Sequence, residues 1–237
     1  MKRAVLLTVD DLLECRIVER VNRFVVSVDI DGLRYRAHVN NTGRLEGFLE
    51  PGLVGYCLRR EDGGRTSHRL VAIADGGSAA LIDTALQMRA FETAVRRNFI
   101  PWLDGAVIMR RNARLGASLL DYLLARDGRD VYLEVKSAVL RNGDYAMYPD
   151  CPTARGLRHV KELARYVRGG GKAVLLFVAA LPRVKAFRPN IAADVALYRE
   201  LIKAKETGVE LRAVRMALDA VANGIIIDEF DLPVIMP

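Results

Sequence analysis

The stretch YLEVKSAVL, residues 132–140, places an acid and a base on one face of a strand that otherwise reads as buried. Glu134 and Lys136 are two positions apart, and side chains at that spacing point to the same face of a β-strand. Such a pair has three explanations: a cross-strand ion pair, part of a metal site, or an accident of a solvated strand edge. The pair alone is a weak signal, because charged residues at this spacing are common on exposed strands.

A predicted hairpin adds an aspartate to this pair. Asp127 and Gly128 are expected to form a two-residue turn, because this dipeptide tolerates the positive φ angles that a tight turn needs. Counting back from the turn along both strands places Asp121 directly opposite Glu134, with Cβ atoms about 5 Å apart. The sequence therefore predicts two carboxylates and a lysine on one face of the sheet.

Two opposed carboxylates destabilise a sheet unless one is protonated or a cation neutralises them. Lys136 is one such cation. In that case the three side chains form a structural cluster in which the charges neutralise one another. Mg²⁺ or Mn²⁺ is another such cation, because these ions prefer carboxylate oxygens and water to nitrogen or sulfur. In that case Asp121 and Glu134 would hold the metal, and Lys136 would orient or deprotonate a water that attacks a phosphate. The apolar strands and the basic helix that follows favour the metal interpretation.

A basic helix is predicted from about Thr153 to Arg168, with apolar residues at helical spacing that should pack on the sheet. One flank carries a stripe that could follow a phosphate backbone, although a charged stripe is more often a solvated face. The stripe consists of Arg158, Lys161, Arg165 and Arg168. The other flank could reach the carboxylate site and holds Arg155, His159, Glu162 and Tyr166. His159 suits a structural hydrogen bond as well as it suits a phosphate contact.

The whole chain sets limits on its class. With 237 residues, 51% of them hydrophobic, it can build one large domain or two small ones with a sizeable core. No run of about 18 apolar residues appears, and acids interrupt the N-terminal stretch too early for a signal peptide. We therefore expect a cytoplasmic protein that does not bind a membrane. The cysteines, Cys15, Cys57 and Cys151, lack the spacing of a zinc site and are expected to be reduced.

Charge and strand pattern divide the chain near residue 78. Residues 1–78 hold 12 basic and 11 acidic side chains, and residues 79–237 hold 24 and 18, so a polyanionic partner should be felt mainly by the second part. In the first part, short β-rich runs with Gly-rich turns predict a small barrel, and Asp31-Gly32 is expected to be one of its hairpin turns.

The second part has the pattern of a mixed α/β domain, with a meander opening its sheet. A helix over 83–98 is followed by strands, a loop that reaches residue 152, and the basic helix. The run KAVLLFVAA (172–180) suits a buried central strand. A last helix is expected to be capped by Asn190 and to end at Gly208, followed by the strand VELRAVRM (209–216).

Separated motifs give the chain a resemblance to a known family. HVNNTGRLEGFLEPG, LEVKSAVL and AMYPDCPTARGLRHVKEL occur here in the family's order, and on them the chain resembles the sugar fermentation stimulation protein (SfsA) family from about Val18 to Met216. The resemblance implies an N-terminal OB-like β-barrel followed by a domain similar to PD-(D/E)XK nucleases, with a mixed central sheet flanked by helices. It also implies nucleic-acid binding and a link to the regulation of sugar metabolism.

The family's nuclease motif, carried over residue by residue, falls on Asp121, Glu134 and Lys136, the trio that the hairpin also predicts. The first helix departs from the family, because a Glu-Glu or Lys-Glu pair is replaced by Glu92-Thr93. Glu92 could join the metal only after a shift of about 100° around the helix. This departure bears on catalysis more than on the fold.

The leading hypothesis is a DNA-binding protein whose second domain, residues 79–237, is a Mg²⁺- or Mn²⁺-dependent nuclease. Asp121, Glu134 and Glu92 are its expected metal ligands, and Arg155 and His159 its expected phosphate contacts. The alternative is a non-catalytic DNA-binding regulator of sugar metabolism genes. The oligomeric state is left open, a homodimer included.

The barrel, residues 1–78, is expected to add to nucleic-acid binding. Barrels of this kind bind single strands with aromatic platforms and basic grooves, and here Phe24, Arg23 and Arg36 could supply both. Asn41, Thr42 and Gly43 are expected to make a tight turn held by local hydrogen bonds.

Overall fold

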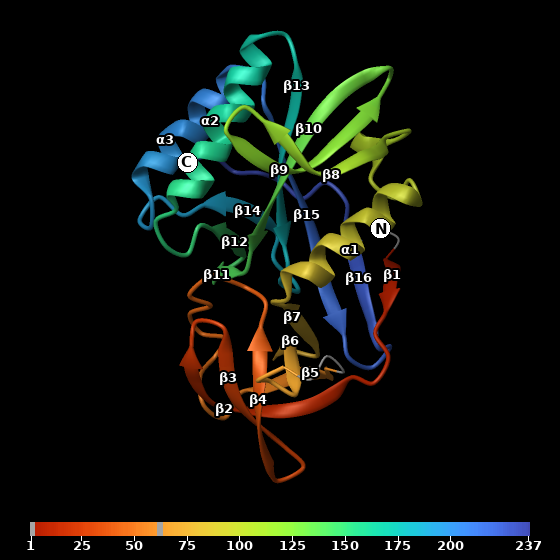
Figure 1. Ribbon diagram of the computed structural model, residues 1–237, viewed down its shortest axis with the longest axis vertical. Coiled ribbons are helices and arrows are strands. Elements are labelled where there is room, and N and C mark those ends of the chain that lie inside the picture. The colour runs from red at the N-terminus through yellow and green to blue at the C-terminus, as the bar shows by residue number, and fades with distance from the viewer. Residues whose placement is uncertain (1–2, 61–63) are drawn as a thin grey trace.

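The computed structural model describes residues 3–60 and 64–237, and Figure 1 shows them as two parts stacked along the long axis. The lower part is a barrel. Its strands are β2 (Leu13–Asn22), β3 (Val25–Ile30), β4 (Leu33–Val39), β5 (Val54–Arg59) and β6 (His68–Asp75). They pair in the order β4-β3-β2-β5-β6, and β4 also pairs in parallel with β6, which closes the sheet. Asp31 and Gly32 have φ angles of 52° and 80° in the β3–β4 turn, as predicted.

The upper part is built on a mixed sheet that continues from the barrel. After β6 the strand order is β7-β15-β13-β10-β9-β8, in which β10, β13 and β15 are parallel. The bounds are β7 (Ser78–Leu81), β8 (Val107–Leu115), β9 (Ser118–Arg126), β10 (Arg129–Ala138), β13 (Lys172–Ala179) and β15 (Glu210–Asp219). Every residue of β13 after Lys172 is buried, as expected for a central strand. The prediction of a barrel followed by a mixed α/β part is confirmed.

Strands from the two ends of the chain meet beside β15. β16 (Gly224–Glu229) pairs antiparallel with β15, and β1 (Ala4–Thr8) pairs antiparallel with β16. The first strand of the chain therefore lies against the last one, in the upper part rather than in the barrel.

Three α-helices of the described residues cover the mixed sheet. They are α1 (Thr84–Arg96), α2 (Ala154–Arg168) and α3 (Val195–Glu206), with a short 3₁₀ turn at Pro101–Leu103. α1 lies on one side and α2 with α3 on the other (Figure 1). On the α1 side, the ring of Phe91 packs 5.4 Å from that of Tyr122 in β9. Different helices thus cover the two faces of β9 and β10.

Two local predictions are wrong. The segment expected as a loop up to residue 152 contains two strands, which form a separate sheet with a third. These are β11 (Leu140–Asn142), β12 (Tyr145–Tyr148) and β14 (Ala186–Pro189). The last helix begins at Val195 rather than near Asn190, because the carboxylate of Asp194 accepts the N–H of Leu197 and caps it there.

Candidate functional site

The hairpin of β9 and β10 brings Asp121 and Glu134 together. Its turn is Asp127-Gly128, with φ angles of 50° and 69°. From this turn the strands keep an unbroken antiparallel register up to the pair just before the two acids. The N–H of Asp121 donates to Oε2 of Glu134 at 3.1 Å, and the N–H of Val135 donates to Oδ2 of Asp121 at 2.8 Å. The predicted opposition of the two carboxylates is confirmed.

The Glu134 carboxylate is held from two further sides. Glu134 is 3% exposed, and its Oε1 lies 2.6 Å from Nζ of Lys136 and 2.5 Å from Nδ1 of His159. Nε of Arg155 donates to Nε2 of His159 at 3.4 Å. With Nε2 as an acceptor, Nδ1 is the ring nitrogen that donates the hydrogen bond to Glu134. The orientation of Glu134 is therefore fixed by α2 as well as by its own strand.

Burial raises the pKa of Asp121 to about 6, and the charge of Glu134 adds to the rise. Burial also opposes the ionisation of Glu134, but the hydrogen bond from His159 and the charge of Lys136 outweigh it and lower the pKa of Glu134. Burial alone would lower the pKa of Lys136, yet the charge of Glu134 raises it. At neutral pH, therefore, the carboxylate of Glu134 and the ammonium of Lys136 stay ionised. The carboxyl of Asp121 beside them has a pKa about one unit below neutral pH.

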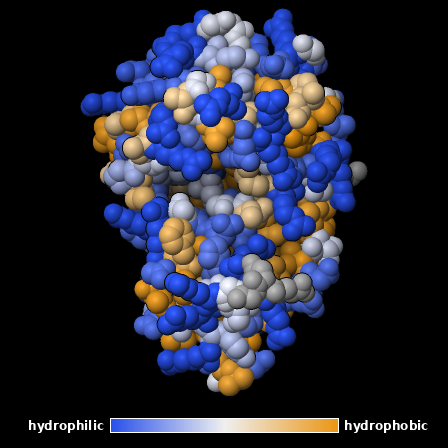
Figure 2. Space-filling view, viewed as in Figure 1, coloured by the Kyte–Doolittle hydropathy of each residue, from blue (hydrophilic) through white to orange (hydrophobic). Residues whose placement is uncertain are grey.

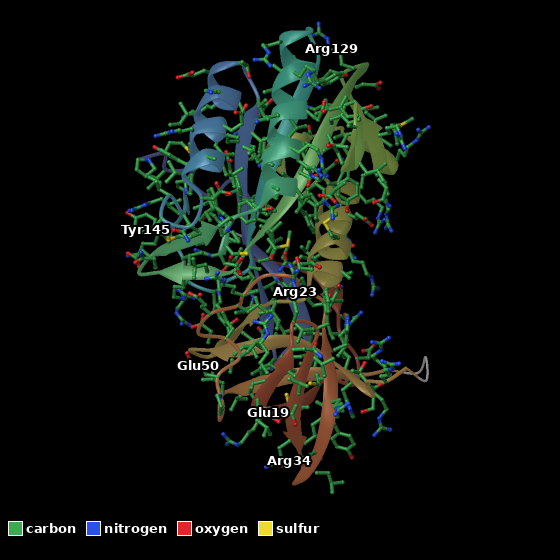
Figure 3. All side chains as sticks on the ribbon, turned by 60° about the vertical axis from the view of Figure 1, so that its left-hand side comes forward. Glu19, Arg23, Arg34, Glu50, Arg129 and Tyr145 are labelled. Carbon is green, nitrogen blue, oxygen red and sulfur yellow. The ribbon has the colours of Figure 1, made fainter. Side chains whose placement is uncertain are left out.

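The carboxylates open into a cavity of about 430 Å³ at the junction of barrel and mixed sheet. Its barrel wall includes Arg23, Phe24 and residues 38–43, and the opposite wall includes Asp121, Lys136 and the first turn of α2. Figure 2 shows the front of the molecule hollowed near mid-height, and Figure 3 places Arg23 at the junction of the two parts. A ligand in this cavity would touch both parts of the chain.

The predicted nucleic-acid residues of α2 are not all brought to the cavity. Arg155 lines it, but Arg158, Lys161 and Arg165 are exposed on the helix and do not. His159 is 2% exposed and does not line the cavity either. The expected phosphate contact of His159 is therefore corrected: the ring lies behind Glu134 and orients it.

Glu92 also lies away from Asp121 and Glu134, although it was expected to be a third metal ligand. Its Oε1 accepts the hydroxyl of Tyr122 at 2.8 Å, and its Oε2 pairs with Arg111. Tyr122 follows Asp121 in β9, and successive side chains of a strand point to opposite faces. The expectation is corrected, because α1 holds Glu92 on the far side of the sheet from Asp121.

The barrel arginines that were predicted to bind nucleic acid lie in or near the cavity wall. Arg23 lines the cavity, and its Nε donates to the carbonyl of Thr42 at 2.9 Å. Arg36 is exposed on β4, two positions from His38 in the cavity wall and on the same face of the strand. The predicted tight turn is confirmed, because the N–H of Gly43 donates to the side chain of Asn41 at 2.9 Å.

Sequence reasoning missed Tyr148, Asp150 and Thr153, which line the cavity. Burial raises the pKa of the Tyr148 hydroxyl, which is hydrogen-bonded to Thr153. Oδ2 of Asp150 accepts the N–H of Leu45 at 3.2 Å and so joins the two walls. The signal that could have found these residues is the stretch AMYPDCPTARG, which contains all of them and carries much of the family resemblance.

The donor set suits a hard divalent cation. No group of three or more His, Cys, Asp or Glu side chains within residues 3–60 and 64–237 is arranged to hold a metal ion. Asp121 and Glu134 would therefore supply two carboxylates, and the remaining positions would fall to backbone, water or phosphate oxygens, which is a mixture that Mg²⁺ accepts. Oδ1 of Asp121 accepts no hydrogen bond from the described residues, and a cation would relieve the unfavourable burial of this carboxylate.

Family models match both parts of the chain. The model described as SfsA N-terminal OB domain matches residues 18–82, and the one described as Sugar fermentation stimulation protein RE domain matches residues 85–221. The chain belongs to the SfsA family. It carries an N-terminal OB domain and a restriction-endonuclease-like (RE) domain.

Two SfsA relatives, both named sugar fermentation stimulation protein homolog, cover most of the chain. The protein of Archaeoglobus fulgidus is 48% identical over 89% of this chain and 91% of its own length, and that of Pyrococcus furiosus is 44% identical over 90% and 93%. A solved structure of Pyrococcus furiosus SfsA in complex with Ca²⁺ is similar over 98% of this chain and 99% of that one, with a TM-score of 0.93 and 42% identity. No helix in the described part of the chain is long and apolar enough to cross a membrane.

Proposed function

We propose that this protein is a divalent-metal-dependent phosphodiesterase that cleaves DNA. The observation that carries the proposal is the cluster of Asp121, Glu134 and Lys136 at a cavity between the barrel and the nuclease-like domain. The OB and RE domains both support nucleic-acid binding. We take residues 1–78 and 79–237 as the two domains, apart from β1, which pairs with β16 in the mixed sheet. The substrate would lie across their junction.

Asp121 and Glu134 would hold Mg²⁺ or Mn²⁺. A metal bound there would supply Lewis-acid activation of a phosphate oxygen and of a water. The structure of the Pyrococcus furiosus relative in complex with Ca²⁺ supports a divalent cation in this family.

The residues of this chain have separate tasks in such a reaction. Lys136 keeps its proton at neutral pH, because its pKa is raised, so it would orient a water and offset negative charge rather than accept a proton. His159 would hold Glu134 in one orientation through its Nδ1–H. Arg155, on the first turn of α2, would meet the phosphate at the helix N-terminus, where the helix dipole favours a negative charge.

The test compares wild type with Lys136→Ala on plasmid DNA and labelled oligonucleotides, with Mg²⁺ or Mn²⁺ and with chelator. Wild type should yield nicked or shortened DNA only with the metal, and Lys136→Ala should cleave at least about 100-fold more slowly, as expected for loss of a group acting in the transition state. Lys205→Ala, an exposed lysine of α3 outside the cavity and the predicted basic stripe, is the matched control and should keep its activity. Equal product from wild type and Lys136→Ala would overturn the assignment.

A second candidate is a non-catalytic DNA-binding regulator of sugar metabolism genes. It is favoured by the position of Glu92 on the far face, by the ammonium of Lys136, which already neutralises Glu134, and by the hydrogen bond between His159 and that carboxylate. This candidate predicts salt-sensitive DNA binding that survives Asp121→Ala, with no metal-dependent cleavage by any form of the protein.

A further inference from the structure

An exposed aromatic ring lies in the wall of the carboxylate cavity. Phe24 is part of the turn between β2 and β3, is 46% exposed, and lines the same cavity as Asp121 and Glu134. It belongs to the barrel, whereas the carboxylates belong to the mixed sheet. The cavity therefore has an apolar platform on one wall and the acidic site on the other.

Hydrogen bonds hold the backbone of the turn that carries Phe24. The N–H of Phe24 donates to the side chain of Asn22 at 2.9 Å. The guanidinium of Arg20 donates to the carbonyls of Asn22 and Arg23, each at 3.3 Å, and to that of Gly43 at 3.1 Å. One side chain thus ties the turn that carries Phe24 to the loop at Gly43.

That loop is in turn joined to the opposite wall. The N–H of Leu45 donates to Asp150, and a Cβ added at Gly43 would lie 2.4 Å from Oδ2 of Asp150, so a larger residue at position 43 would displace the carboxylate that joins the two walls. A chain of contacts therefore fixes the backbone of Phe24 relative to the carboxylate wall. Because that backbone is ordered before binding, only the side chain of Phe24 has to be ordered when a ligand stacks on its ring.

A positive charge accompanies the ring. The guanidinium of Arg23 lies 5.8 Å from the centroid of Phe24, and its Nε is anchored to the carbonyl of Thr42. On the facing wall, Arg155 and the N-terminus of α2 offer a second positive region beside the acids. Aromatic platforms with arginine beside them are how proteins bind single-stranded nucleic acid.

We propose that this cavity takes one unstacked nucleotide, with its base on Phe24 and its phosphate at the carboxylate wall. The substrate is then a DNA strand that is single-stranded at the scissile phosphate. This inference rests on the proposed function and names its substrate class. A base inside a duplex has both faces covered by its neighbours and cannot stack on a ring in a cavity wall unless it leaves the helix. The volume of about 430 Å³ also falls in the range of sites for one small ligand, about 300–1,000 Å³.

The experiment measures binding rather than cleavage. Fluorescence anisotropy of the full chain, with Ca²⁺ present, compares a labelled single strand with a blunt duplex of the same length and sequence. The variants are Phe24→Ala, Phe24→Tyr and the control Leu33→Ala. Leu33 is 60% exposed on the same barrel but lies at the β3–β4 turn outside the cavity, next to Arg34, which Figure 3 shows at the far end of the barrel from Arg23.

The single strand should bind wild type more tightly than the duplex. Phe24→Ala should weaken single-strand binding about tenfold or more, as expected for loss of one stacked base, and leave duplex binding unchanged. Phe24→Tyr should restore the affinity, and Leu33→Ala should not alter it. Equal binding of both DNA forms, or unchanged single-strand affinity in Phe24→Ala, would overturn the inference.

The outcome is separable from that of the proposed function. If Phe24 governs single-strand binding and no form of the protein cleaves with Mg²⁺, the subsite stands and the phosphodiesterase proposal fails. If wild type cleaves blunt duplex DNA as fast as single strands and Phe24→Ala has no effect, the phosphodiesterase proposal stands and the subsite fails.

Discussion

Nδ1 of His159 lies 2.5 Å from Oε1 of Glu134, so that a residue of α2 sets the orientation of a carboxylate in β10. Both side chains are almost completely buried. Because the ring does not line the cavity, it acts on a ligand through the cavity residues that it contacts, Glu134 and Arg155. This makes His159 a positioning residue, with consequences that differ from those of a phosphate contact.

His159→Ala should slow metal-dependent cleavage about 10- to 100-fold, as is typical when an outer partner of a metal ligand is lost. Arg155 keeps its charge in this variant although it loses its hydrogen bond to the ring, so the salt dependence of DNA affinity should not change. His159→Asn keeps an N–H donor near the Nδ1 position and should recover part of the rate. Arg155→Ala is the comparison, because loss of a phosphate contact should reduce the slope of affinity against salt by about one. A reduced slope in His159→Ala would contradict the positioning role.

The titration of Asp121 predicts an unusual pH dependence of stability without metal. Its pKa is about 6 in the folded protein against an ordinary 3.8, so folding favours the protonated carboxyl. That contribution is complete below the ordinary pKa and is lost as the pH rises through about 6. The difference corresponds to about 3 kcal/mol in the free energy of unfolding.

Asp121→Asn removes this titration while keeping an oxygen for the Val135 N–H. Urea unfolding without divalent cations should find the variant as stable as wild type in acid and more stable by up to about 3 kcal/mol at pH 8. A variant that is less stable than wild type at pH 8 would show that Asp121 is not held in an unfavourable environment.

The junction of the two domains depends on the close approach of Gly43 and Asp150. A Cβ at Gly43 would lie 2.4 Å from Oδ2 of Asp150, so Gly43→Ala should lower the free energy of unfolding by about 1–3 kcal/mol. In an Asp150→Ala background this clash is absent and only the 3.1 Å approach to Oδ1 of Asn41 remains, so the same substitution should cost less. A double-mutant cycle by urea unfolding measures this coupling. Equal costs in both backgrounds would contradict the contact.

The position of Glu92 gives a test of the corrected ligand set. Glu92→Gln should keep metal-dependent cleavage near the wild-type rate, because its side chain lies on the α1 side of the sheet with Tyr122. It should lower the free energy of unfolding by about 1–3 kcal/mol through weaker buried hydrogen bonds. Loss of cleavage in a stably folded Glu92→Gln would contradict the placement.

The part of the site that the sequence predicts is the part that depends on local geometry. A tight turn at Asp127-Gly128 determines the register of its own hairpin, and register alone brings Asp121 opposite Glu134. The direction of Glu92 is a different problem. It depends on which face of the sheet α1 covers, and a helix pattern gives its apolar side but not its place in the fold.

The same distinction between local and long-range contacts explains which parts of the fold the sequence predicts. The barrel hairpin at Asp31-Gly32 is local and was predicted, whereas the pairing of Tyr145–Tyr148 with Ala186–Pro189 joins short strands that are far apart in the chain. Strand β1 finds its partner at the opposite end of the sequence. Asn190 and Asp194 are both suitable caps by residue type, and only the three-dimensional position of Asp194, which also accepts the N–H of Thr153, decides between them.

The most direct test of the metal-dependent site is a calorimetric titration of Mn²⁺ into wild type, Glu134→Gln and Glu92→Gln, repeated with DNA present. It needs no knowledge of the preferred substrate, and the two variants remove one buried carboxylate each from opposite faces of the sheet. We expect Mn²⁺ binding by wild type and Glu92→Gln and its loss in Glu134→Gln. Absence of Mn²⁺ binding to wild type in both titrations, or equal binding by Glu134→Gln, would contradict it.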